Sequence, residues 1–368
     1  MANSLVGFGA ILMISIPQSF YAIFFARFVA GIGHGLAYVA VVQHFGEICD
    51  RQMRGRLGTS LHLFILKGGI ISGSLVIRFF SAQSRMDPNR FLGIFSLCLS
   101  CIAMLMTLVF FKESIVTLVQ QKKENEAVEM LVLLRGQSKE TPEITAEVNE
   151  IKMMLAEDKH KSSDIFSDGN LKPLLIVTLL RIAFVLSFNY GLKYIHVVMT
   201  HKSKSGTDYT FILNLIHTFV VVFVMFTIDN GLRRNYFMVS AVGTSLILIV
   251  FGCLRASMYA DLDLLVFIMF VCFEFFSAIG LGLTAHIYST EAFATPKKSA
   301  SIAFSSIIEH ICQIAFLIWV DNQIYSNSFD IILLIFSGSV LGAITIYLFL
   351  YLPETRSLSI CETKNKFL

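Results

Sequence analysis

The sequence predicts an all-α integral membrane protein with about ten membrane helices. Three observations predict it: hydrophobic residues fill 55% of the 368 positions, charged residues fill only 15%, and the apolar residues come in long runs. An average soluble domain is about a quarter charged. A run of about 20 apolar residues can cross a bilayer as a helix. The net charge of +3 is small and dispersed, which argues against a nucleic-acid partner.

A window of about 19 residues identifies the individual membrane helices. Four of them precede a long polar segment and six follow it, so we expect a 4+6 arrangement. The chain then divides into an N-terminal bundle (1–111), a helical linker (112–171), a C-terminal six-helix bundle (172–351) and a tail (352–368). The expected spans are 2–19, 20–43, 57–79, 91–111, 172–194, 208–228, 235–254, 263–287, 299–320 and 331–351.

The linker is rich in Lys and Glu and contains two helix signals. Its stretch 120–136 (QQKKENEAVEMLVLLRG) carries apolar residues at helical spacing. The stretch 141–155 begins with Thr, Pro and early acidic residues, which is a helix-start signature. We therefore expect a small amphipathic subdomain outside the membrane.

The orientation follows from Lys and Arg in the loops, because cytoplasmic loops carry the excess of these residues. With the linker left aside, one side of the membrane holds ten of them and the other holds seven. The richer side includes the loops at 44–56, 229–234 and 291–298 and the tail. We expect that side, the linker and both termini to be cytoplasmic, in a multi-pass protein of the plasma membrane.

A charged motif occurs once in each half of the chain. Glu47 precedes Arg54 by seven residues, and Glu291 precedes Lys298 by seven residues, each time just before an apolar span. After one further helical hairpin, another glutamate follows 66 residues after the first and 63 residues after the second. The two halves therefore look like a parallel repeat of the kind built into transporters.

The same spacing predicts that something is missing from the first half. The polar loop 228–234 would have its counterpart about fifteen residues before Met1. We therefore expect a 6+6 architecture without its first two helices, or a sequence that continues upstream of Met1. Without those helices, ionisable residues in the cavity would meet lipid at a cost, and an oligomer or a second subunit would offset it.

Carboxylates at helix ends can pair with arginines of neighbouring loops and clamp helices in one conformation. We expect Glu291 to pair with one of the two arginines of 229–234, and Glu47 to pair locally with Arg54 and Arg56. The alternative is that arginines gather in cytoplasmic loops by the positive-inside rule alone. The candidate gating residues are Arg27, Glu47, Arg54, Glu113, Asp229, Arg233, Arg234, Glu291, Lys298, Glu354 and Arg356.

Six motifs follow one another along nearly the whole chain. They are RFVAGIGHG (27–35), E-x6-RG (47–55), ES (113–114), D-x3-RR (229–234), Y-x-x-E-x-F-x4-K (288–298) and PETR (353–356). In this order they resemble the sugar porter family of the major facilitator superfamily. The resemblance implies a major facilitator-type helical bundle. It also implies a facilitative or secondary-active transporter that moves a small solute, first of all a sugar, by alternating access.

The resemblance also places the substrate site. Three histidines stand where family members usually carry Gln, Asn and Trp, and a usual pair of Gln is replaced by Ala183 and Phe184. An Asn and a Tyr of the family pattern are kept in 187–194, and a usual polar patch follows Lys298. The candidate substrate-binding residues are His62, Asn189, Tyr194, His217, His286, Glu309, His310 and Gln313.

These replacements leave alternatives open. Neutral amides grip sugar hydroxyls with matched donors and acceptors, so their loss also fits an organic cation, a proton-coupled solute or a non-transporting truncated membrane protein. For each histidine, core packing is an equally good interpretation. For Glu309, the structural alternative is a buried pair with Arg181 or Lys67.

The sequence gives no sign of an enzyme, because it contains no convincing nucleophile, acid–base dyad or nucleotide-binding loop. No two histidines share i,i+4 spacing on one expected helix, so we expect neither a metal site nor a cofactor. The expected partners are a small-molecule solute and the lipid bilayer.

Overall fold

The computed structural model describes the chain except residues 64–86, 159–163, 188–208, 258–262, 324–328 and 368. Every regular element in this described part is a helix. Two compact units are present. The first comprises Met1–Ile48 and Gly68–Lys152, and the second comprises Cys49–Lys67 and Met153–Leu368.

The first unit contains three apolar helices that pack through small residues. Helix α1 (Ala2–Ser15) contacts both α2 (Phe20–Ile48) and α5 (Pro88–Phe110). A Cβ at Gly9 would lie 2.6 Å from the carbonyl oxygen of Ala26 in α2, so glycine permits this close approach. Ser100 of α5 donates to the carbonyl of Asn3 in α1 at 2.7 Å.

Three short helices form the linker subdomain: α6 (Ile115–Gln120), α7 (Glu124–Leu134) and α8 (Pro142–Asp158). Helix α7 lies within the predicted stretch 120–136, and α8 covers nearly all of the predicted stretch 141–155 and continues for three more residues. Their apolar faces are buried at Ala127, Leu131, Ile144 and Val148. Two ion pairs flank this small core, Arg135–Glu147 at 2.5 Å and Lys152–Glu124 at 2.7 Å.

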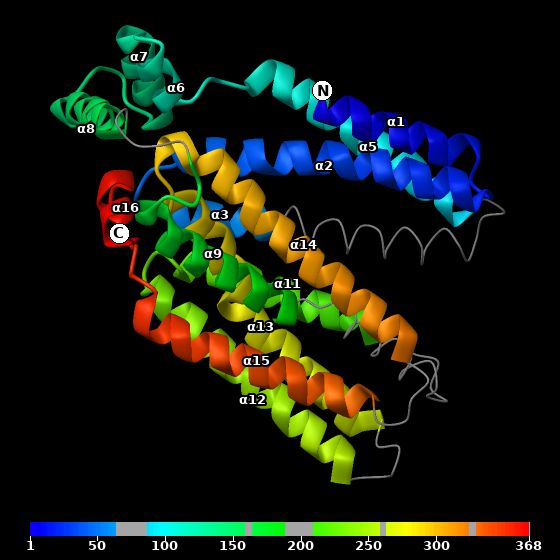
Figure 1. Cartoon of the computed structure of the whole chain (residues 1–368). Coiled ribbons are helices and arrows are strands. Elements are labelled where there is room, and N and C mark those ends of the chain that lie inside the picture. The colour runs from blue at the N-terminus through cyan, green and yellow to red at the C-terminus, as the bar shows by residue number, and fades with distance from the viewer. Residues whose placement is uncertain (64–86, 159–163, 188–208, 258–262, 324–328, 368) are drawn as a thin grey trace. The chain divides into compact units, whose positions relative to one another are not determined.

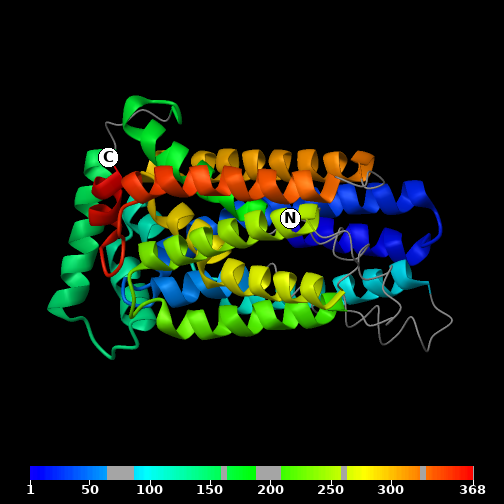
Figure 2. The ribbon, with the colours of Figure 1, turned by 90° about the horizontal axis from the view of Figure 1, so that it is seen from below.

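The second unit is a bundle of long helices with three short helical elements beside it. Figures 1 and 2 show α12 alongside α15, and α13 is the other main neighbour of α12. The elements are α3 (Arg54–His62), α9 (Asp168–Ser187), α11 (Tyr209–Thr227), α12 (Arg233–Ser257), α13 (Asp263–Glu291), the 3-10 helix η2 (Thr295–Lys297), α14 (Lys298–Gln323), α15 (Phe329–Tyr351) and α16 (Ile360–Phe367).

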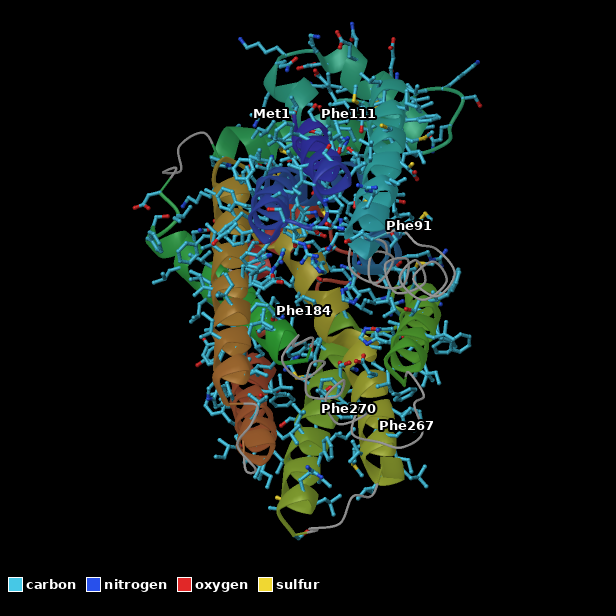
Figure 3. All side chains as sticks on the ribbon, turned by 90° about the vertical axis from the view of Figure 1, so that its right-hand side faces the viewer. Met1, Phe91, Phe111, Phe184, Phe267 and Phe270 are labelled. Carbon is cyan, nitrogen blue, oxygen red and sulfur yellow. The ribbon has the colours of Figure 1, made fainter. Side chains whose placement is uncertain are left out.

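An apolar core holds one end of the second unit together. Phe251 of α12 and Phe270 of α13 make an edge-to-face ring contact, with ring centroids 5.4 Å apart. Phe273, Leu333 and Leu334 join them in the same buried cluster. Figure 3 labels Phe267 and Phe270 on α13 in this region. The core fixes α12, α13 and α15, and α13 also carries several of the polar residues described below.

Seven helices of the described part are long and apolar enough to cross a membrane. Two more apolar helices, Ala2–Ser15 and Ile212–Thr227, are shorter in the residues described. Three of the expected spans, 57–79, 172–194 and 208–228, run partly into residues outside the description. The count of ten, and the 4+6 division, therefore stay predictions.

Candidate functional site

One buried carboxylate ties together three helices of the second unit. Glu291 is the last residue of α13, and its Oε1 accepts hydrogen bonds from Arg233 of α12 at 2.8 Å and Arg54 of α3 at 3.2 Å. The three side chains are at most 4% exposed. Charge-assisted bonds of this kind are the stronger class of protein hydrogen bond.

A second carboxylate extends the group. Asp229 accepts a hydrogen bond from the backbone N–H of Arg56 at 2.8 Å, and its other oxygen lies 3.5 Å from Arg233 Nη2. A Cβ at Gly55 would overlap the Asp229 carboxylate, which explains why glycine follows Arg54. We call Arg54, Asp229, Arg233 and Glu291 the ion cluster.

The C-terminal segment lies against the ion cluster. Thr355 accepts from Arg233 at 3.3 Å, and the carbonyl of Leu358 accepts from Arg54 at 3.5 Å. Helix α16 begins with a capping box, in which Ser359 and Glu362 each bond the backbone N–H of the other.

Further contacts hold the same segment in place. Phe367, fully buried at the end of α16, meets the ring of Tyr288 edge-on. Glu354 accepts from the backbone N–H groups of Arg234, Thr355 and Arg356. These contacts pack the C-terminal segment against this end of the bundle.

The structure shows which of the two arginines expected to pair with Glu291 does so. Arg233 is the partner, whereas Arg234 uses its backbone N–H on Glu354 and its guanidinium on the carbonyl and ring of Phe349. Neighbouring residues on a helix point to different faces, so only one of them can meet Glu291.

The expected local pairing of Glu47 is wrong. Arg54 bonds Glu291 across the bundle, and Arg56 places its guanidinium over the ring of Phe226. Glu47 instead accepts from Gln43, one turn earlier on its own helix, at 3.1 Å. The physical reason is that α3 packs on α13 and α11, which turns the first turn of α3 towards Glu291.

The structure also locates the remaining candidate gating residues on their elements. Arg27 and Glu113 are exposed in the first unit, on α2 and just after α5. Lys298 is buried in the first turn of α14, and Arg356 is half-buried beside Glu354.

The three predicted histidines His62, His217 and His286 come together with Phe184, one each from α3, α11, α13 and α9. The ring centroid of His62 lies 5.7 Å from those of Phe184 and His286, and 6.1 Å from that of His217. Phe184, labelled in Figure 3, lies 5.9 Å from His286. All four side chains are at most 4% exposed. We call these four residues the ring cluster.

Two carboxylates within the helices are paired with bases. Glu274 lies 2.6 Å from His217 Nδ1. Glu309 accepts from Arg181 Nη1, also at 2.6 Å. Arg181 in addition donates to Ser289 Oγ from Nε at 3.2 Å and Nη2 at 2.9 Å. The pair of Glu309 with Arg181 was one of the open alternatives, while the roles of Glu274 and Ser289 were not predicted.

The other predicted substrate residues lie elsewhere or outside the description. His310 is exposed, and its Nδ1 lies 2.7 Å from the carbonyl of Ser306 on the same helix. Gln313 is half-buried one turn beyond Glu309. Asn189 and Tyr194 fall outside the described residues. Among the residues that the structure describes, no three His, Cys, Asp or Glu side chains are arranged to hold a metal ion.

The sequence and the fold both match known transporters. The family model described as "Sugar (and other) transporter" matches residues 1–367. The mouse protein "Solute carrier family 2, facilitated glucose transporter member 2" is 26% identical over 384 aligned residues, which cover all of this chain and 71% of that protein. "Hexose transporter 1" of Plasmodium falciparum is 23% identical, and the alignment covers 94% of this chain and 72% of that one.

A solved structure shows the same fold. It is the major facilitator superfamily proton:xylose symporter XylE bound to 6-bromo-6-deoxy-D-glucose, with a TM-score of 0.82 at 18% identity. The match covers all of this chain and 82% of that one. The family match over the whole chain shows that the chain belongs to the sugar transporter family, a family of multi-pass membrane transporters and not of enzymes, and its fold is that of the major facilitator superfamily symporter XylE.

Proposed function

We propose that the protein carries a small neutral sugar, of monosaccharide size, across a membrane by alternating access. The observation that supports this is the ring cluster, together with the pairing of each carboxylate near it with a basic side chain. His62 and His286 offer ring nitrogens that can donate to or accept from hydroxyl groups, and Phe184 offers an apolar face. In the described part of the helices, Glu274 and Glu309 each face a base. A site with neutral donors and acceptors and without an unbalanced carboxylate suits the hydroxyl groups of a sugar better than it suits an ammonium group.

In this proposal, the ion cluster is the contact that breaks and re-forms during alternating access. Arg54 precedes the linker and Glu291 follows it, so their bond joins the two halves of the sequence repeat. Opening this end of the bundle would require Arg54 to leave Glu291 and the Leu358 carbonyl. We assign this end to the cytoplasm because the excess of Lys and Arg lies there, and we place both termini on that side of the plasma membrane.

Binding and flux of labelled sugars by the purified 368-residue chain test this proposal. D-glucose and D-xylose should bind saturably in detergent and should equilibrate across proteoliposomes, while L-glucose serves as the control for leak. Binding of either D-sugar with flux above that control supports a transporter. If neither D-sugar shows saturable binding, the substrate class proposed here is wrong. If a D-sugar binds but shows no flux above L-glucose, the chain alone is a sugar-binding membrane protein without transport.

A further inference from the structure

Arg181 donates hydrogen bonds from more of its guanidinium nitrogens than the buried Arg54 and Arg233 do. It is 1% exposed, and all three of its guanidinium nitrogens donate. One bonds Glu309 of α14 and two bond Ser289 of α13, whose hydroxyl in turn donates to the Ala285 carbonyl. The planar fork of arginine suits such a fixed arrangement, and a lysine could not reproduce it.

This pair lies beside the ring cluster. Arg181 and Phe184 are three residues apart on α9, and His286 and Ser289 are three residues apart on α13. Arg181 contacts Ser289, and Phe184 contacts His286, so the two contacts lie one turn apart along the same pair of antiparallel helices. One turn is about 5 Å of helix. The Arg181–Glu309 pair and the rings therefore form one continuous polar region.

Exposure distinguishes the two partners of the pair. Glu309 is 14% exposed, whereas Arg181 is 1% exposed. The carboxylate is thus the partner that a solute in this region can reach, and the guanidinium lies behind it. A carboxylate has more acceptor positions than one guanidinium nitrogen can fill, so Glu309 can accept a bond from a solute hydroxyl while its charge stays balanced.

We infer that Arg181 determines the charge selectivity of the site. It neutralises Glu309 and orients it as an acceptor for hydroxyl groups, so that the site takes neutral sugars and does not favour aminosugars in their ammonium form. Without Arg181, Glu309 would be a carboxylate without a counter-charge next to the ring cluster, and a cationic solute would bind more tightly relative to a neutral sugar. This inference rests on the proposed sugar function, and it makes Arg181 a positioning residue that acts through Glu309.

Competition between D-glucosamine and D-glucose tests the inference. Displacement of labelled D-glucose from the purified full chain gives the ratio of the two affinities, with N-acetyl-D-glucosamine as a neutral control. Arg181→Gln should shift the ratio towards glucosamine by about tenfold or more, since one uncompensated charge at close range is worth at least that much. Arg181→Gln combined with Glu309→Gln should bring the ratio back to near the wild-type value.

Two further variants keep the test decisive. Arg181→Lys retains the charge, so it should weaken both sugars while the ratio stays unchanged. Glu309→Gln removes the carboxylate and keeps the positive charge of Arg181, so it should shift the ratio away from glucosamine even if Arg181→Gln fails to accumulate. If Arg181→Gln, or Glu309→Gln in its place, weakens both sugars equally with no change in ratio, the pair is only a structural clamp and the inference is wrong. Wild-type protein that binds neither sugar would instead contradict the proposed function.

Discussion

The ion cluster and the Arg181–Glu309 pair are both buried, yet their bonds are organised differently. In the ion cluster, two arginines share a single oxygen of Glu291. Within the described residues, Glu291 Oε2 and the Nε atoms of Arg54 and Arg233 have no hydrogen-bond partner. In the Arg181–Glu309 pair, by contrast, every guanidinium nitrogen of Arg181 donates a hydrogen bond.

The difference indicates two different jobs. A buried ion pair repays the cost of desolvation only when its geometry is good and its remaining groups are bonded. The Arg181–Glu309 pair meets that condition and should hold one arrangement. The ion cluster meets it incompletely, so the free energy needed to separate its members is smaller than four charged residues in one buried group would suggest. Incomplete bonding suits a contact that must break and re-form.

The largest expected effect comes from removing the shared carboxylate. Glu291→Gln removes the carboxylate that Arg54 and Arg233 share and leaves only Asp229, 3.5 Å from Arg233, to balance the two buried arginines. Breaking a buried pair in this way costs about 3–5 kcal/mol. We expect a much lower melting temperature for the purified protein and more than tenfold slower sugar flux. Exchanging the charges, with Glu291→Arg and Arg233→Glu together, should recover part of both.

Glu47→Gln is the matched control for this variant. Glu47 accepts a hydrogen bond from Gln43, one turn earlier on its own helix. Its substitution should change stability and flux far less than Glu291→Gln does. Equal losses from the two variants, or no recovery in the charge exchange, would contradict the role given to Glu291.

The next largest effect should come from crowding the ring cluster. A Cβ at Gly282 would overlap the imidazole of His62, so Gly282→Ala must displace that ring. Overpacking of this kind costs about 1–3 kcal/mol, and about 1.4 kcal/mol is a tenfold change in affinity. We expect the Kd for sugar, measured by equilibrium binding, to rise about tenfold.

Gly35→Ala in α2 provides the comparison for Gly282→Ala. A Cβ at Gly35 meets no atom within 4 Å, so the same chemical change should leave binding unaltered. If Gly282→Ala binds sugar as the wild type does, the ring cluster is packing and not part of the substrate site.

Much of this organisation could be predicted from the sequence, because it is carried by spacing. The apolar run predicted a membrane helix over 263–287, and α13 runs from Asp263 to Glu291, four residues further. The motif register also assigned three distant histidines to one site, and their rings lie close together. The pairing of Glu291 with one arginine of 229–234 was expected, and it is observed with Arg233.

What the sequence could not give is the direction in which each side chain points. Spacing along a chain fixes a helix end, but the rotation of α3 about its axis depends on how it packs against α13. For that reason the sequence predicts a bond between Arg54 and Glu47, whereas the structure shows Arg54 bonded to Glu291. The sequence likewise predicts that His310 belongs to the site, yet its side chain is exposed and its Nδ1 lies 2.7 Å from the carbonyl of Ser306 on the same helix. The contact of Ser289 with Arg181 spans 108 residues, and no local pattern signals it.

The smallest effect should come from an ion pair that is neither clamped nor buried. Arg135 and Glu147 of the linker subdomain are 2.5 Å apart, but their side chains are 15% and 37% exposed. Exposed pairs contribute about 0.2–1 kcal/mol and are screened by salt. Arg135→Ala, Glu147→Ala and the double variant should therefore give a coupling of that size in thermal melts at low salt, and less at high salt. Sugar flux should stay at the wild-type rate in all three. A coupling of several kcal/mol, or slower flux in the single variants, would show that the linker takes part in the working cycle and that burial alone does not rank the ion pairs of this protein.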